Sequence, residues 1–222
     1  MTDSATTKGE QTRELILSTA LRLFREQGYG KTTMRAIATE AGVSVGNAYY
    51  YFGSKEHLMQ AYYDHLQEQH REAVRSVLVD EKAFAARLSG VLRVWLDVSA
   101  PYHEFAATFF KTAADPRSPL SPFSTESQPA RDASIEIFRE VVAGSDLKLS
   151  ADLAAELPEL LWLLQMGIVL FWVHDDSEDL RRTKTLIERS VPLIDRLLRL
   201  TRIPGVRGVV NDIVGLIRSI KS

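Results

Sequence analysis

The stretch TTMRAIATEAGVSVGNAYYYFGSKEHL, residues 32–58, contains two short helical patterns on either side of a glycine. The apolar spacing predicts one helix over 34–41 and a second over 45–52. Gly42 is a typical stop signal for the first helix, and Ser44 is a typical N-cap for the second. Two helices joined by so short a turn predict a helix-turn-helix.

The same residues contain the pattern G-x-S-x-G over residues 42–46, which is typical of the nucleophile elbow of a serine hydrolase. That elbow requires a strand directly before the serine, so that a sharp turn exposes the hydroxyl. The residues before Ser44 have helical spacing, and His57, His65 and His70 have no β-rich framework around them. A serine hydrolase that uses Ser44 is therefore only a distant third hypothesis, and we expect no enzyme.

Helical spacing continues along the whole chain, so we predict an all-α fold. A first helix starts near Thr12 and stops at Gly28, Thr32 or Thr33 can cap the second, and Ser54 can cap a long fourth helix that runs towards Val77. An irregular segment follows at 114–129, where four prolines remove backbone donors. We predict a DNA-binding domain at residues 1–54 and a larger helical domain at 55–222, with further helices at about 82–99, 102–113, 130–143, 150–174, 178–200 and 205–220.

Composition excludes several classes of protein. The 222 residues include no cysteine, which excludes disulfides and thiolate-held zinc, and the five histidines are scattered, so we expect no metal and no cofactor. The polar N-terminus lacks the apolar core of a secretory signal, which favours a cytoplasmic protein. The apolar run over 160–173 is shorter than the ~20 residues of a membrane span, and Gln165 interrupts it. We therefore expect a buried helix there and no membrane partner.

The leading end of the second helix is the part that enters the DNA major groove in a helix-turn-helix. The side chains of Val45 and Asn47 are predicted to point outward, and Gly46 allows the backbone to approach closely. Asparagine can bond to adenine through two hydrogen bonds, and valine can contact the methyl group of thymine. These three residues are our candidates for reading base sequence in double-stranded DNA.

Another group of residues can hold the DNA backbone. Tyr49 and Tyr50 are expected at the surface, where a phenol can donate to a phosphate without reading sequence. Lys55 lies in the first turn of the following helix, where backbone N–H groups also favour an anion. Thr33 and Arg35, at the start of the first of the two helices, are placed to contact the opposite strand.

The quoted stretch resembles the DNA-binding region of the TetR family of transcriptional regulators, whose members share the pattern G-V-S…Y-x-Y-F-x-x-K-E-x-L. The resemblance covers about residues 12–60, and beyond it only chain length and helical character agree. The matching residues are Thr33, Ala38, Gly42, Val43, Ser44, Gly46, Tyr49, Tyr51, Phe52, Lys55, Glu56 and Leu58.

The resemblance implies a homodimeric, ligand-responsive regulator, usually a repressor, that binds a palindromic operator. It also implies that Ser44, like the two tyrosines and Lys55, contacts the DNA backbone. An activator or a ligand-independent regulator of the same fold remains the alternative hypothesis.

The C-terminal half contains two wide apolar helix faces that can pair with those of a second copy in a four-helix bundle. We therefore predict a homodimer through helices near 150–174 and 178–200, although the same faces could form the core of one chain. The predicted faces are Leu160, Leu163, Leu164, Ile168 and Phe171 on one helix, and Leu186, Ile187, Leu193, Ile194, Leu197 and Leu198 on the other.

Aromatic residues are frequent among the central helices and can line a pocket for a mainly apolar small-molecule effector. Such residues at helical spacing also occur in plain cores, so both interpretations remain open. His103 and Glu104 are possible polar groups of this pocket, and the 114–129 segment could act as its lid. The remaining candidate ligand-binding residues are Trp95, Phe105, Phe109, Phe110, Phe138, Trp162 and Met166.

Overall fold

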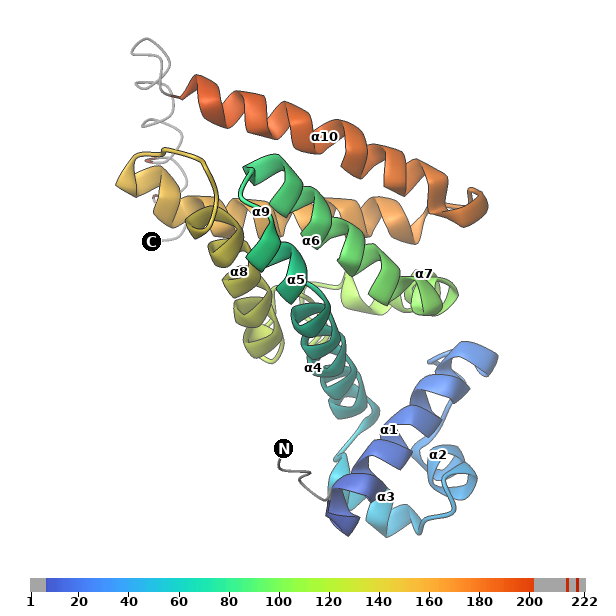
Figure 1. The fold of residues 1–222 in the computed structure, drawn as a ribbon. Helices are drawn as coiled ribbons and strands as arrows, with labels where there is room; N and C mark the ends of the chain where they lie inside the picture. Colours follow the sequence, from blue (N-terminus) through green and yellow to red (C-terminus); the bar gives the residue numbers. More distant parts are fainter. Residues whose placement is uncertain (1–6, 202–214, 216–218, 220–222) are drawn as a thin grey trace. The chain divides into compact units, whose positions relative to one another are not determined.

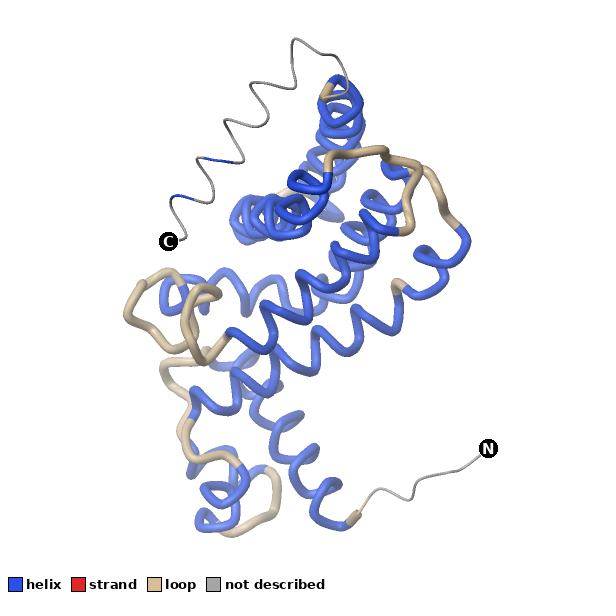
Figure 2. The backbone as a smooth tube through the Cα atoms, turned by 90° about the vertical axis from the view of Figure 1, so that its left-hand side faces the viewer, coloured by secondary structure: helices blue, strands red, loops and turns tan. Residues whose placement is uncertain are grey.

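The computed structural model describes residues 7–201, 215 and 219, apart from the side chains of residues 107–109 and 111. Throughout this part of the chain the regular structure is helical (Figure 2), which confirms the predicted all-α fold. The helix predicted at 205–220 lies outside the described residues. Figure 1 labels the α-helices as α1 Lys8–Gln27, α2 Met34–Glu40, α3 Val45–Tyr51, α4 Lys55–Ala73, α5 Arg75–Asp80, α6 Phe84–Ser99, α7 His103–Ala113, α8 Gln128–Ala143, α9 Ala151–Val173 and α10 Arg181–Leu200.

Two helix boundaries differ most from the prediction. Helix α1 begins four residues before Thr12, because Thr7 and Glu10 form a capping box in which each side chain bonds the other's backbone N–H. The long fourth helix is interrupted at Val74, so that α4 and α5 are separate. Val74 carries no side-chain cap, and no glycine or proline marks the break.

The chain divides into two compact units. Unit 1 contains residues 1–66 and 102–131, and unit 2 contains residues 67–101 and 132–222. The three N-terminal helices therefore share unit 1 with α7 and the segment that follows it. Helices α4 and α8 each begin in unit 1 and end in unit 2.

The core of unit 1 is built where α1, α2 and α3 meet. Ile16 and Ile37 are fully buried there, and Ala48 allows α3 to approach its neighbours closely. The core is completed by residues far away in the sequence: Phe105 on α7 stacks on Phe24 with ring centroids 5.8 Å apart. Phe105 of α7 thus belongs to the same core as the helix-turn-helix.

The proline-rich segment also packs into unit 1, and its role as a pocket lid stays a prediction. The Gln60 side chain donates to the Pro119 carbonyl at 2.7 Å, and the Tyr63 hydroxyl donates to the Leu120 carbonyl at 3.2 Å. Leu120 is 1% exposed and forms part of the core. Hydrogen bonds and burial therefore hold this segment against α4.

A buried arginine joins three helices of unit 2. Arg87 on α6 is 2% exposed, and its Nε and Nη2 donate to the carbonyls of Val141 and Glu140 at 3.0 and 2.6 Å. Its Nη1 donates to the carbonyls of Leu78 and Glu81, each at 2.7 Å. These carbonyls lie at the C-terminal ends of α5 and α8, where a helix leaves its acceptors unsatisfied. Burial lowers the pKa of Arg87, and these acceptors compensate for its lost hydration.

A buried carboxylate orders the turn between α9 and α10. Asp175 accepts hydrogen bonds from the backbone N–H and the hydroxyl of both Ser177 and Thr183, at 2.6–3.0 Å. Burial raises the pKa of Asp175, but these hydrogen bonds outweigh burial and hold it at about 2. The turn also contains Asp179 and Leu180 at φ 53° and 56°, a conformation that costs free energy for residues other than glycine.

Candidate nucleic-acid interface and effector-binding region

The turn between α2 and α3 is a Schellman motif. The Gly42 N–H donates to the Thr39 carbonyl at 3.2 Å, and the Val43 N–H donates to the Ala38 carbonyl at 2.9 Å. Gly42 has φ +67°, which a residue with a Cβ adopts only with strain. The glycine therefore fixes the direction in which the chain enters α3.

Hydroxyl caps start both short helices, as predicted. The Thr33 side chain accepts from the Ala36 N–H, and the Ser44 side chain accepts from the Asn47 N–H, both at 3.1 Å. Ser44 follows a helix and a turn, so the strand that a nucleophile elbow requires is not in front of it. No histidine bonds to Ser44 among the residues that the structure describes, and its hydroxyl serves as a cap.

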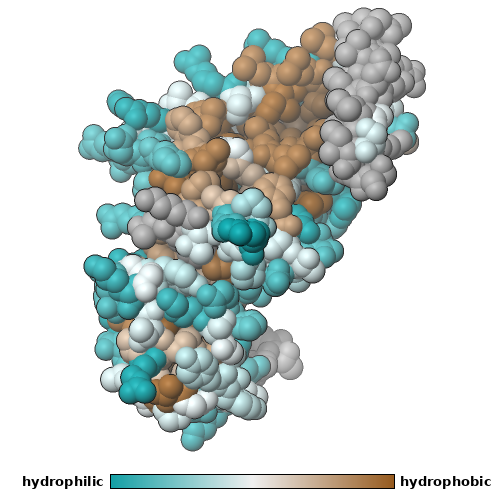
Figure 3. Space-filling model, turned by 180° about the vertical axis from the view of Figure 1, so that it is seen from behind, coloured by the Kyte–Doolittle hydropathy of each residue, from teal (hydrophilic) through white to brown (hydrophobic). Residues whose placement is uncertain are grey.

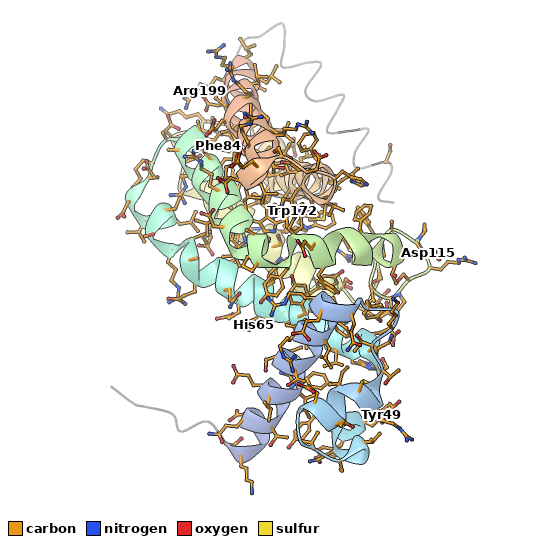
Figure 4. The ribbon with its side chains drawn as sticks, turned by 90° about the vertical axis from the view of Figure 1, so that its right-hand side faces the viewer. Tyr49, His65, Phe84, Asp115, Trp172 and Arg199 are labelled. Carbon is orange, nitrogen blue, oxygen red and sulfur yellow. The ribbon has the colours of Figure 1, made fainter. Side chains whose placement is uncertain are left out.

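The outer side of α3 is polar and accessible. Asn47 and Gly46 are exposed, and Tyr49 and Tyr50 are 51% and 81% exposed. Figure 4 labels Tyr49, whose side chain lies on the outside of this helix. Val45 is half-buried and packs on the core of unit 1, so its side chain points outward less than the sequence predicted.

The other residues predicted to contact the DNA backbone differ in exposure. Thr33 and Arg35 are exposed at the start of α2. Lys55 is half-buried: its ammonium group donates to the Tyr29 carbonyl at 2.9 Å and lies 4.4 Å from the centre of the Tyr29 ring. The Tyr29 hydroxyl in turn donates to Glu56 at 3.2 Å. The sequence pattern did not indicate this interaction, which leaves two donors of the ammonium group.

The predicted ligand-binding residues divide between the two units. Trp95, Phe138 and Trp162 are buried in unit 2, and Met166 is half-buried there. Trp95 contacts Trp172 edge to face, with ring centroids 5.4 Å apart. This part of the predicted set forms an aromatic interior between α6, α8 and α9.

The other predicted ligand-binding residues lie on α7 in unit 1. Phe105 is 4% exposed and belongs to the core described above, whereas His103 and Phe110 are half-buried. The side chain of Phe109 lies outside the described residues. Helical spacing treated the predicted ligand-binding residues as one set, but it cannot show that the chain returns to the first unit after residue 101.

A cleft of about 600 Å³ lies in unit 2 between α5 and the ends of α4 and α8, with Arg87 from α6 beside it. None of the predicted ligand-binding residues lines it. Its two accessible arginines are paired: Arg71 with Glu140 at 2.7 Å and Arg75 with Glu72 at 2.9 Å. The lining residues are Arg71, Val74, Arg75, Leu78, Val79, Arg87, Glu140, Ala143 and Gly144.

Helices α9 and α10 expose apolar side chains on the surface of unit 2, and Figure 3 shows a broad apolar area on one face. Three residues of the predicted dimer faces, Ile168, Ile187 and Leu198, are buried within the unit instead, because those helices pack on each other. The buried-helix prediction for 160–173 is therefore only half right, since one side of α9 is accessible. The large exposed apolar residues are Leu163, Leu170, Phe171, Leu193, Leu197 and Leu200.

The fold and the turn geometry define the class of helix-turn-helix proteins. Within this class, residues 16–62 match the family model of bacterial regulatory proteins of the tetR family. Residues 87–216, more than half of the chain, match the tetracyclin repressor-like C-terminal domain. The chain therefore belongs to the TetR family, whose members are transcriptional regulators with a ligand-binding C-terminal domain and not enzymes.

Three named regulators match part of this chain. HbdR of Aromatoleum sp. is 50% identical over 50 residues, which are 22% of each chain. UidR of Escherichia coli strain K12 is 39% identical over 75 residues, 34% of this chain and 37% of UidR. TtgR of Pseudomonas putida is 38% identical over 69 residues, 31% and 33% of the two chains. The matches thus span a fifth to about a third of the length of these regulators.

Solved structures match over most of the chain at low identity, which shows a shared fold. A TetR regulator from Nitrosomonas europaea has a TM-score of 0.63 at 20% identity, covering 82% of this chain and 96% of that one. FadR from Bacillus halodurans, a fatty acid degradation regulator, has a TM-score of 0.61 at 18% identity, covering 84% and 94%. Thermus thermophilus FadR in complex with lauroyl-CoA has a TM-score of 0.56 at 23% identity, covering 81% and 92%.

Two further findings concern membranes and metals. Helix α9 is long and apolar enough to cross a membrane by length and composition, a test that core helices of soluble proteins also pass. Among the described residues, no group of three or more His, Asp or Glu side chains is arranged to hold a metal ion.

Proposed function

We propose that this protein is a cytoplasmic, ligand-responsive transcriptional repressor that binds a palindromic operator as a homodimer and is released by a mainly apolar small molecule. The observation that carries the proposal is the accessible outer side of α3 behind a turn fixed by Gly42. A short helix held in this way can enter a major groove without rearrangement of its own core.

In this proposal the leading end of α3 reads bases. Asn47 is exposed and can bond adenine, and the exposed backbone at Gly46 allows close approach to the groove. Val45 is half-buried, so it contacts the methyl group of a thymine through the accessible edge of its side chain. The base preference of the protein is then set mainly by Asn47.

The surrounding residues hold the phosphates. Tyr49 and Tyr50 present hydroxyls from α3, and Arg35 adds a positive charge from the start of α2. Thr33 and Ser44 use their hydroxyls as helix caps but can still donate to a phosphate, because the cap bond only occupies an acceptor position. Lys55 contributes its two remaining N–H donors and is held in place by Tyr29.

Dimerisation is supported by the apolar surface of α9 and α10. Leu193 and Leu197 are 58% and 64% exposed, which is costly for adjacent leucines in water. An isologous contact between these helices and their copies would remove the surface from water and form a four-helix bundle. A dimer would also supply two α3 helices for one DNA duplex, whose half-sites are spaced about one helical turn apart.

The effector would bind in the ligand-binding C-terminal region, which we propose to begin at residue 55, after a DNA-binding domain at 1–54. The aromatic interior around Trp95, Phe138 and Trp162 supports an apolar ligand, because such a lining gives affinity through burial. Thermus thermophilus FadR, which shares the fold, holds lauroyl-CoA. Release from DNA requires that the effector bind more tightly to the conformation that does not fit the operator.

Selection of bound fragments from random duplex DNA tests the proposal. We expect a palindromic motif whose half-sites are spaced by about one helical turn. Adding an effector should then release the protein from that motif, and a reporter under the selected operator should rise in expression. A reporter that falls in expression would instead indicate an activator, and the absence of any enriched motif would contradict the proposal.

A further inference from the structure

Three buried polar atoms on α4 and α6 have no hydrogen-bond partner in the part of the chain that the structure describes. They are Gln67 Oε1, His70 Nδ1 and Ser99 Oγ. His70 and Ser99 are each 1% exposed. Buried polar atoms are bonded in the large majority of cases, so a group of three calls for an explanation.

Two of these atoms, on Gln67 and His70, lie on α4 where that helix meets α6 in unit 2. His70 Nε2 lies 3.0 Å from the carbonyl oxygen of Val91 on α6, which places the imidazole between the two helices. Gln67 is one turn before His70 on the same side of α4. Ser99 continues the buried side of α6 two turns beyond Val91, about 12 Å at a rise of 1.5 Å per residue.

The contact with Val91 determines the chemistry of the histidine. A carbonyl oxygen only accepts hydrogen bonds, so Nε2 must carry the proton. Burial lowers the pKa of His70, more than the bond to Val91 raises it, and the ring is therefore neutral near pH 7. In a neutral ring with the proton on Nε2, Nδ1 is an acceptor. Gln67 Oε1 is also an acceptor, so two of the three unpartnered atoms need a donor.

The surroundings of these atoms are apolar. Trp95 lies on the same side of α6 between Val91 and Ser99, and it packs on Trp172 of α9. Trp172 is labelled in Figure 4 and lies in the interior of unit 2. The site therefore combines an aromatic wall with hydrogen-bond acceptors at one end.

The buried charges of unit 2 are already occupied by protein groups. Asp175 bonds Ser177 and Thr183, and Arg87 bonds four backbone carbonyls. A cationic ligand would lack a carboxylate here, and a carboxylate ligand would direct lone pairs at two acceptors. Either charged ligand would lose its hydration without gaining a compensating hydrogen bond or ion pair at these atoms.

We infer that Gln67 and His70 form the polar end of the effector site, and that the effector is a neutral molecule with a hydroxyl or N–H donor on an aromatic or aliphatic body. The inference rests on the proposed ligand-responsive function and adds the chemistry of the ligand. It sets this protein apart from the FadR that holds lauroyl-CoA, whose ligand is an anion.

The test uses the full chain and three probes that share a hexylphenyl body and differ in the para substituent: 4-hexylphenol, hexylbenzene and 4-hexylbenzoate. The three tryptophans of the protein all lie in unit 2, so their fluorescence reports binding there. At pH 7.5 we expect the phenol to bind about tenfold more tightly than hexylbenzene, because it adds a hydrogen bond to a buried acceptor. The benzoate should bind more weakly than either.

A matched pair of variants tests the assigned residues. Gln67→Met keeps the length of the side chain and removes the acceptor, so the phenol should bind only as well as hexylbenzene does. Gln69→Met, an exposed position on the same helix, should retain the tenfold preference. Nitrogen NMR of the wild-type protein gives a readout that needs no variant: the His70 Nδ1 resonance should move with the phenol and not with hexylbenzene.

Several outcomes would overturn the inference: benzoate binding as tightly as the phenol, no binding of the phenol, an unchanged preference in Gln67→Met, or an unmoved Nδ1 resonance. Failure of the wider proposal is distinguishable. A preference for the phenol without any selected DNA motif would support the proposed site and contradict the repressor function. Selection of an operator together with a preference for the benzoate would support the repressor function and contradict the proposed site.

Discussion

The accessible side of α3 and the accessible sides of α9 and α10 differ in chemistry. Helix α3 exposes an amide, two phenols and a glycine backbone, all of which can bond a polar partner. Helices α9 and α10 expose leucines and a phenylalanine, which gain only from being removed from water. The two surfaces therefore suit different partners, a hydrated polyanion in unit 1 and an apolar protein surface in unit 2.

The two regions are also stabilised differently. The turn before α3 depends on local signals, a positive-φ glycine and two hydroxyl caps. Unit 2 depends on long-range polar contacts, such as Arg87 to the ends of α5 and α8. A change in α3 should therefore alter binding with little effect on folding, whereas a change at Arg87 should do the reverse.

The largest effect should follow from charging the apolar surface of unit 2. Leu197→Glu would place a carboxylate from each copy in the proposed dimer interface, so we expect a monomer by analytical ultracentrifugation. Loss of the second α3 should weaken operator binding by about 10²–10⁴-fold, the usual gain from two linked sites. Thr185→Glu introduces the same charge on an exposed polar part of α10 and should remain a dimer. A dimeric Leu197→Glu protein would place the interface elsewhere.

Removing the buried arginine should have the next largest effect, and on folding alone. Arg87→Met removes the donor to the carbonyls of Leu78, Glu81, Glu140 and Val141, although Glu140 keeps the bond from the Gly144 N–H. We therefore expect a loss of about 3–5 kcal/mol in the free energy of unfolding. Urea unfolding followed by circular dichroism measures it.

Arg93→Met provides the control for this change. It removes an exposed ion pair with Glu188, which should cost at most about 1 kcal/mol. A loss for Arg87→Met as small as that of the control would mean that the carbonyls find other donors.

The Asp175 turn should give unit 2 an acid-dependent stability. The folded-state pKa of about 2 lies below the ordinary value of about 3.9, so the stabilisation is complete above pH 4–5 and is lost as the pH falls towards 2. Asp175→Asn should be less stable than the wild type by on the order of 2 kcal/mol at pH 7. The two proteins should converge near pH 2. A difference that stays constant from pH 7 to pH 2 would show that the carboxylate charge is not responsible.

The smallest effect concerns a single proposed phosphate contact of unit 1. Tyr50→Phe removes an exposed hydroxyl, so operator affinity should fall by up to about tenfold for every sequence alike. The salt dependence should stay the same because no charge is lost. Tyr51→Phe, at a half-buried position of the same helix, should leave affinity unchanged. A changed base preference in Tyr50→Phe would assign this residue to sequence reading instead.

Local signals explain how much of this structure could be predicted from sequence. The caps at Thr33 and Ser44 and the glycine at 42 lie next to the residues they affect, so the helix-turn-helix was predicted nearly residue by residue. The break at Val74 has no such signal. It is associated with long-range packing, because Val77 of α5 lies so close to Gly90 that a Cβ there would be 2.5 Å away.

Residues distant in sequence account for what was missed. Phe105 has the same helical spacing as the residues of unit 2, yet it completes the core of unit 1. Spacing shows that one side of a helix is apolar but not which neighbour covers it, so Ile187 and Leu197 were predicted alike although only the first is buried. Gln67 and Ser99 are common residue types, and only the folded chain reveals that their oxygens are buried without a partner among the residues that the structure describes.

The most direct test of the account compares DNA selection by the wild type with selection by Asn47→Ala. Because Asn47 is the exposed side chain at the leading end of α3, we expect the variant to recover the same palindrome with one base pair per half-site relaxed, at a cost of about 1–3 kcal/mol. An identical motif from both proteins would contradict base reading by Asn47, and no motif from the wild type would contradict DNA recognition by α3 altogether.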